Sequence, residues 1–104
     1  MTTGDVTVER RDDERRYVLL LGGEHAGELV FRERGGGVLA FLHTEVDPEK
    51  RQRGLGSALV RAALEDARER GLRVVAICPF VEAYLRNHPE YADLAVADPA
   101  RRSR

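Results

Sequence analysis

The sequence lacks the features that identify several large classes of protein. It has no tryptophan, one methionine and a single cysteine, Cys78, in 104 residues. One cysteine excludes an internal disulfide, which fits a reducing cytoplasm. No apolar run approaches the ~18 residues of a membrane-spanning helix, and residues 1–5 lack the basic and apolar segments of a signal peptide. We therefore expect a cytoplasmic protein with no membrane partner.

An excess of charge of either sign is also missing. The chain has 17 basic residues against 18 acidic ones, a formal net charge of −1. Because general nucleic-acid binders concentrate basic charge on one face, this balance argues against a nucleic-acid partner. We also expect no metal site, because neither His25 nor His88 has a cysteine or carboxylate at the spacing of metal ligands.

Length and hydrophobic content predict one small domain. Hydrophobic residues make up 42% of the chain, enough for a single core. We expect this compact domain to span residues 1–97 and a disordered basic tail to span residues 98–104.

The first half of the chain reads as four strands separated by turns. The expected strands span residues 6–9, 17–21, 25–33 and 38–46. Glycine pairs and triplets after the second and third of these strands are strong hairpin signals. The charged segment 10–16 is expected to be a solvated turn with no helix.

From residue 54 the apolar residues recur with the period of a helix. We expect a helix over residues 54–70 with Gly71 as its C-cap, a central β-branched strand over 72–78, and a short helix over 80–87 that starts after Pro79. The element order β-β-β-β-α-β-α predicts an α/β (α+β) fold with a single mixed, mainly antiparallel sheet. The strand–helix–strand unit should be a right-handed crossover.

The turn at residues 51–57 is the candidate anion site. Gly54 and Gly56 lead into a helix N-terminus, where unpaired N–H groups and the helix dipole favour a phosphate. Basic residues flank the glycines: Lys50, Arg51 and Arg53. The same residues also fit an ordinary strand-to-helix turn with a basic rim. Neither a P-loop nor a complete dinucleotide-binding fingerprint is present.

The pattern Arg-x-x-Gly-x-Gly at residues 51–56 resembles the acetyl-CoA signature of the GNAT superfamily of N-acetyltransferases, [Q/R]-x-x-G-x-[G/A]. Further segments extend the resemblance to the small, stand-alone YjdJ-type branch, over roughly residues 6–96. These segments are His43-Thr44-Glu45-Val46, Gly56-Ser57-Ala58-Leu59-Val60, Cys78-Pro79-Phe80, Tyr84 and His88-Pro89-Glu90-Tyr91.

This resemblance implies a fold and a cofactor site. The fourth and fifth strands would splay apart, and the pantetheine arm of acetyl-CoA would lie in the gap, paired with a backbone N–H near Val46. Backbone N–H groups of the glycine turn would bind the pyrophosphate, and Lys50 or Arg51 would reach the 3′-phosphate of CoA. The implied cofactor-binding residues are Val46, Arg51, Arg53, Gly54, Leu55, Gly56 and Ser57.

Acetylation of an amine requires a base, an oxyanion site and an acid for the departing thiolate. His43 and Glu45 are two residues apart in a strand, so they share one face beside the gap. His43 is the candidate base, directly or through water, and Glu45 is a candidate to orient the amine. Each also has a structural alternative: a packed strand histidine, and a residue that simply ends a strand.

Two further catalytic candidates follow the fifth strand. Tyr84 resembles the general acid that many GNAT enzymes aim at the CoA sulfur; alternatively it is a core aromatic that packs on Phe80. Cys78 ends the strand and faces the gap, where it would contact the acetyl group. A covalent acetyl-cysteine and an inert buried cysteine are the alternatives for this residue.

The acceptor site is expected to be shallow and open. Larger members of the superfamily place helices between the first two strands, where this chain has only residues 10–16. An open site suits a protein or peptide amine. We therefore expect an acetyl-CoA-dependent N-acetyltransferase, with CoA as product. The alternatives are a CoA- or acyl-CoA-binding module with little turnover, which would not need His43, Glu45 or Tyr84, and an interaction domain without a ligand.

Overall fold

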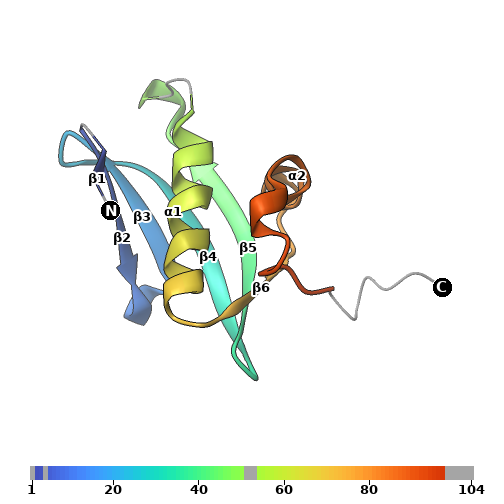
Figure 1. Ribbon diagram of the computed structural model, residues 1–104. Coiled ribbons are helices and arrows are strands. Elements are labelled where there is room, and N and C mark those ends of the chain that lie inside the picture. The colour runs from blue at the N-terminus through green and yellow to red at the C-terminus, as the bar shows by residue number, and fades with distance from the viewer. Residues whose placement is uncertain (1, 4, 51–53, 98–104) are drawn as a thin grey trace.

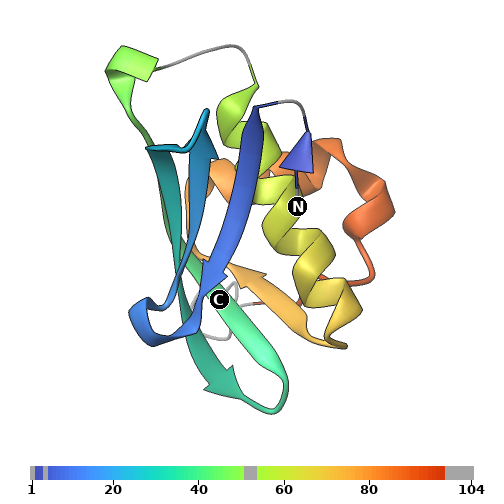
Figure 2. The ribbon, with the colours of Figure 1, turned by 90° about the vertical axis from the view of Figure 1, so that its left-hand side faces the viewer.

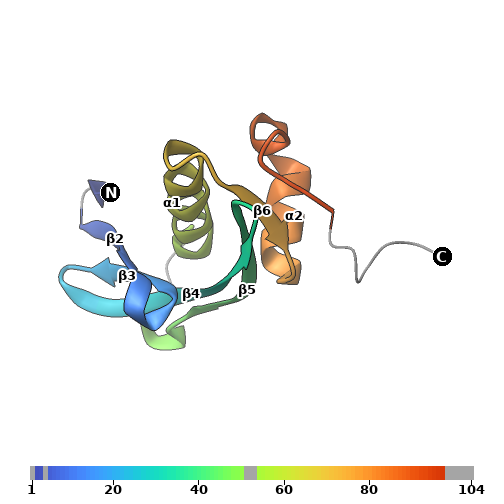
Figure 3. The ribbon, with the colours of Figure 1, turned by 90° about the horizontal axis from the view of Figure 1, so that it is seen from below.

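One curved sheet of six strands carries both helices on the same face (Figures 1, 2 and 3). This computed structural model describes residues 2–3, 5–50 and 54–97. The strands lie in chain order across the sheet, antiparallel except for the last pair, which is parallel. They are β1 (Thr2–Thr3), β2 (Val6–Arg11), β3 (Arg16–Leu21), β4 (Glu24–Gly35), β5 (Val38–Val46) and β6 (Arg73–Ala76).

The predicted fold class and the order of the seven predicted elements are confirmed. The short strand β1 was not predicted, because two threonines give no periodic signal. The central position predicted for the fifth strand is wrong, since β6 is the last strand of the sheet. Its apolar character has another cause: the segment after the second helix covers its outer edge. The Val74 N–H donates to the Leu94 carbonyl at 2.8 Å, and the Val96 N–H donates to the Val74 carbonyl at 2.9 Å.

The two helices, α1 (Leu55–Glu69) and α2 (Pro79–Asn87), match the predicted ones to within a residue. Gly71, with φ +72°, follows α1 in the left-handed conformation that glycine adopts at a helix end. The described residues also form three 3₁₀ turns: η1 (Asp12–Glu14), η2 (Pro48–Lys50) and η3 (Pro89–Tyr91). No helix in the described ranges is long and apolar enough to cross a membrane.

The connection between β2 and β3 is short and exposed, as predicted, but it is not free of helical structure. Asp12–Glu14 forms the single 3₁₀ turn η1, and all three acidic side chains are exposed. One such turn cannot wall a binding site. The predicted tail over 98–104 lies outside the described residues, so its disorder stays a prediction.

The core lies between the sheet and the two helices. Three aromatic rings meet in it: the ring centroid of Tyr17 lies 5.3 Å from that of Phe31 and 6.1 Å from that of Phe41. The helices contribute Leu59, Leu64 and Val81 among other buried residues, so one apolar cluster joins α1 and α2 to the middle strands.

A polar network ties the C-terminal half of α1 to the sheet. The carboxylate of Asp66 accepts hydrogen bonds from the Arg10 guanidinium at 2.8 Å, the Tyr17 hydroxyl at 2.8 Å and the Arg70 guanidinium at 3.2 Å. Burial alone would raise the pKa of Asp66, but these three donors outweigh it and lower that pKa. The ionised carboxylate therefore stabilises the docking of α1 on β2 and β3.

Candidate active site

β5 and β6 separate partway along their length. They pair from Val38 to Phe41 on one strand and from Arg73 to Ala76 on the other. Beyond this point the N–H groups of Ile77 and Cys78 both donate to the Phe41 carbonyl at 3.0 Å, while β5 continues to Val46 without β6 beside it. The splayed strand pair expected from the sequence is therefore present.

A β-bulge lies where the two strands part. Phe41 pairs with Phe31 across the β4–β5 ladder, but His43 pairs with Val30, so Leu42 is left without a partner. A bulge inserts one extra residue and changes which side chains face each side of the sheet. Phe31 and Phe41 belong to the core, whereas Val30 and His43 lie on the opposite face.

The bulge gives the end of β5 two chemically different faces. His43 and Glu45 lie on the face of the sheet that no described helix covers, which we call the bare face. Thr44 and Val46 alternate with them and lie on the helix face. The strand end therefore presents titratable side chains on one side of the gap and smaller side chains on the other.

His43 and Glu45 lie together on the bare face, as predicted. The Nε2 atom of His43 is 3.8 Å from Oε1 of Glu45, and the two side chains are 61% and 68% exposed. This exposure excludes the structural alternative of a packed strand histidine. Both groups are accessible to a substrate that approaches from solvent.

Cys78 and Thr44 meet across the gap on the helix face. The Cys78 thiol donates to the Thr44 hydroxyl at 3.5 Å, and the cysteine is buried. Thr44 lies in the part of β5 that pairs with β4 but not with β6, and Cys78 directly precedes α2. Their contact therefore joins the two elements that separate at the gap. Cys78 faces the gap, as expected.

Tyr84 is buried between α2 and the turn that follows it. Its ring stacks on His88 with centroids 3.8 Å apart and lies 6.2 Å from the ring of Tyr91. Burial raises the pKa of Tyr84, which keeps its hydroxyl protonated and able to donate. Tyr84 belongs to the apolar core cluster, as the alternative of a core aromatic expects. The Phe80 ring lies against Gly56 on the other helix, and packing of Tyr84 on Phe80 stays a prediction.

The N-terminus of α1 begins at Gly54, which has φ +86° and is exposed. A side chain at this φ would be strained, so the backbone itself requires glycine. The N–H groups of Leu55, Gly56 and Ser57 have no acceptor within the helix. The Leu55 side chain is buried in the core, so only its backbone can contribute to a site.

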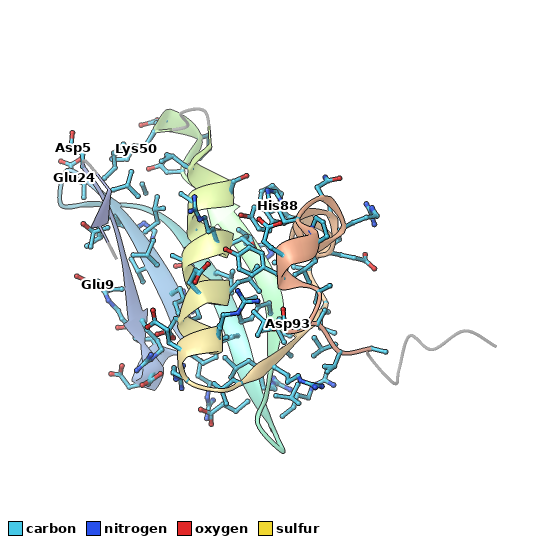
Figure 4. All side chains as sticks on the ribbon, in the orientation of Figure 1. Asp5, Glu9, Glu24, Lys50, His88 and Asp93 are labelled. Carbon is cyan, nitrogen blue, oxygen red and sulfur yellow. The ribbon has the colours of Figure 1, made fainter. Side chains whose placement is uncertain are left out.

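The basic rim of the glycine turn is described only in part. Arg51 and Arg53 lie outside the described residues, so their roles stay predictions. Lys50 is paired with acids: its Nζ atom is 3.3 Å from Oε1 of Glu24 and 3.9 Å from Oδ2 of Asp47 (Figure 4). A phosphate would have to compete with these carboxylates for the ammonium.

The backbone of Val46 is oriented toward the gap. The N–H of Asp47 donates to the Ala26 carbonyl in β4 at 2.7 Å. Successive N–H groups along a strand point to opposite edges, so the N–H of Val46 points away from β4. That is the edge from which β6 has departed.

The reason given for expecting no metal site is corrected at His25. His25 does have a carboxylate neighbour, because its Nε2 atom lies 3.5 Å from Oε1 of Glu28. That carboxylate is also 2.7 Å from the Arg16 guanidinium, so it is already neutralised by a cation. Within the ranges that the structure describes, no group of three or more His, Cys, Asp or Glu residues could hold a metal ion.

Two residues of this region were not singled out by the sequence: Thr44 and Phe80. Both stand in segments that carry the family resemblance, but neither spacing nor residue type predicts their contacts. Which face Thr44 occupies depends on the bulge at Leu42, and nothing in that residue marks a bulge.

Comparisons with known proteins point to one family and one fold. A family model described as GCN5-related N-acetyl-transferase matches residues 16–94. Protein NATD1 of Mus musculus is 29% identical over 87 residues, which are 83% of this chain and 79% of that protein. The solution structure of a GCN5-like protein from Staphylococcus aureus has a TM-score of 0.67 at 20% identity and covers 95% of this chain and 96% of its own.

A third similar protein was solved with a ligand. This Bacillus anthracis protein, crystallised in complex with acetyl coenzyme A, has a TM-score of 0.50 at 22% identity. The match covers 64% of this chain and 43% of that chain. The YjdJ-type subtype is not distinguished by these matches and stays a prediction.

Proposed function

Because the chain belongs to the GCN5-related N-acetyltransferase family, we propose that it transfers the acetyl group of acetyl-CoA to an amine of a protein or peptide. The observation that carries this proposal is the two-sided gap at the end of β5. The helix face has the glycine turn, Thr44 and Cys78, while the bare face has His43 and Glu45. A donor and an acceptor can therefore meet in the gap from opposite sides.

The donor binds on the helix face. The pyrophosphate of acetyl-CoA lies at the N–H groups of Gly54–Ser57, where the helix dipole favours an anion. The pantetheine arm pairs with the Val46 N–H in the gap, in place of the departed β6. Its thioester then lies near Thr44 and Cys78. Acetyl-CoA in the similar Bacillus anthracis structure supports this choice of donor.

The acceptor approaches from the bare face. His43 removes a proton from the ammonium, directly or through a water, and Glu45 orients the amine beside it. The amine nitrogen then bonds to the acetyl carbon, the carbon–sulfur bond breaks, and the CoA thiolate takes a proton from the Tyr84 hydroxyl. The nitrogen gives up its remaining extra proton to solvent, and solvent returns a proton to Tyr84, so that the products are the amide and CoA thiol. Exposure of His43 and Glu45 suits an amine carried on a large, extended substrate.

Release of free thiol from acetyl-CoA tests the proposal. Purified protein is assayed with peptides that offer an N-terminal or lysine amine and with small polyamines. We expect peptide-dependent turnover that falls at least about a hundredfold in His43→Ala, with CoA affinity unchanged. His25→Ala is the matched control, because His25 is also on the bare face and 55% exposed.

The outcomes separate the competing functions. Tight CoA binding with no turnover on any amine would indicate a binding module, and turnover on polyamines alone would contradict a peptide acceptor. Absence of CoA binding would overturn the donor site itself.

A further inference from the structure

Phe80 is an exposed aromatic side chain that reaches from one helix to the other. It lies in the first turn of α2, is 43% exposed, and is the one large hydrophobic side chain exposed in the part of the chain that the structure describes. The far end of its ring points at Gly56. A Cβ atom added to Gly56 would lie 3.0 Å from Cζ and 3.3 Å from Cε2 of this ring.

This contact gives Gly56 a different requirement from Gly54. Gly54 has a positive φ, with nothing within 4 Å of an added Cβ. Gly56 lies within α1 and does not have a left-handed φ. A Cβ atom added to it would instead press on the Phe80 ring. The first glycine is therefore required by the backbone, and the second is required by a neighbouring side chain.

The ring spans the two halves of the donor site. Its tip lies at Gly56 in the glycine turn, and its backbone is two residues beyond Cys78, which contacts Thr44 in the gap. The Phe80 ring therefore lies beside a direct path from the glycine turn to the gap. An aromatic side chain that is partly exposed in the free protein gains apolar contact when a molecule that follows this path covers it.

We propose that Phe80 binds the pantetheine arm of the acetyl donor and that position 56 is glycine so that the Phe80 ring can lie beside the glycine turn. This inference rests on the proposed function, because it takes acetyl-CoA as the donor. It assigns Gly56 a role through Phe80 rather than through close approach of the pyrophosphate to its Cα atom.

A double-mutant cycle in CoA binding tests the assignment. Calorimetry measures the dissociation constant of CoA for the wild type, Phe80→Ala, Gly56→Ala and the double variant. We expect about tenfold weaker binding for each single variant and no more than about twofold further loss when Gly56→Ala is added to Phe80→Ala. Phe80→Leu, which keeps an apolar side chain, should recover most of the affinity.

Thermal melting of each variant separates an effect on CoA binding from an effect on folding. Alanine is a better helix former than glycine, so Gly56→Ala should not lower the melting temperature even though it weakens binding. Arg86→Ala, an exposed position farther along α2, is the matched control and should bind CoA like the wild type.

Two results would overturn the inference while leaving the proposed function intact. One is a Phe80→Ala variant that binds CoA as tightly as the wild type. The other is a Gly56→Ala effect that is equally large with and without Phe80, which would place the ligand itself against Gly56. If the wild type binds no CoA, it is the proposed function that fails.

Discussion

The two ends of α1 are built for different purposes. At the C-terminal end, Asp66 accepts hydrogen bonds from Arg10, Tyr17 and Arg70, and these contacts fasten the helix to the sheet. At the N-terminal end, Gly54 is exposed and offers no side-chain cap. At the first end the polar side chains are paired within the protein, and at the other the first backbone N–H groups have no acceptor in the helix, where we propose that a ligand binds.

If the proposed donor site is correct, stability and binding should be separable along this one helix. Substitutions at the C-terminal end should change the free energy of unfolding and leave CoA affinity alone. Substitutions at the N-terminal end should lower CoA affinity and leave the free energy of unfolding unchanged. Variants at both ends of α1 can therefore test whether the two ends are independent.

The largest effect is expected at the N-terminal end, for Gly56→Asp. A carboxylate here is compatible with the helix dipole, so the fold should survive, but it places negative charge at the proposed pyrophosphate site. CoA affinity should fall at least about a hundredfold, about 2.7 kcal/mol. Calorimetry measures the affinity and thermal melting checks the fold. Undiminished binding by a folded variant would contradict the site.

At the opposite end, Asp66→Asn should destabilise the protein without weakening CoA binding. The substitution removes the negative charge that pairs with Arg10 and Arg70, and bonds to charged groups contribute about 1.5–3 kcal/mol. We expect a loss of about 2 kcal/mol in the free energy of unfolding, measured with urea. Equal losses of stability and of affinity would show that the two ends are not independent.

Acidification should remove the stabilisation that Asp66 provides at the C-terminal end of α1. The folded-state pKa of Asp66 is lowered, so its contribution is complete above the unfolded value of about 3.9 and is lost as the pH falls through the folded pKa. The difference in unfolding free energy between the wild type and Asp66→Asn should therefore shrink below about pH 4. A difference that stays constant to lower pH would contradict the assignment.

The smallest effect is expected for Cys78→Ala, beside the gap. Direct transfer from acetyl-CoA to the amine needs no cysteine nucleophile, so acetylation should fall by no more than about tenfold, about 1.4 kcal/mol of barrier. A loss of several orders of magnitude, together with an acetyl adduct on Cys78 in mass spectra that is passed on to an added amine, would instead support a covalent intermediate.

Most of the fold could be predicted because its signals are local. Hairpin glycines, the apolar period of residues 54–70 and Pro79 each fix a boundary through short-range sterics and burial. The position of β6 could not be predicted in this way. A buried β-branched run looks the same whether another strand or the returning segment 94–96 covers its edge.

The sequence predicts which residues belong to the candidate site, but it does not predict how they are arranged in space. Spacing alone places His43 and Glu45 on one face, but only the bulge at Leu42 decides that this is the bare face. The contact between Phe80 and Gly56 joins two helices that are far apart in the sequence. Such long-range contacts follow from packing, which no local pattern records.

The most direct test of the proposed donor site is a titration of ¹⁵N-labelled protein with CoA, followed through backbone amide resonances. If CoA binds in the gap and at the glycine turn, the largest shifts should occur at the amides of Val46, Gly54, Gly56 and Ser57, with little change around Asp66. Shifts confined to the bare face or to the C-terminal end of α1, or no shifts at saturating CoA, would contradict it.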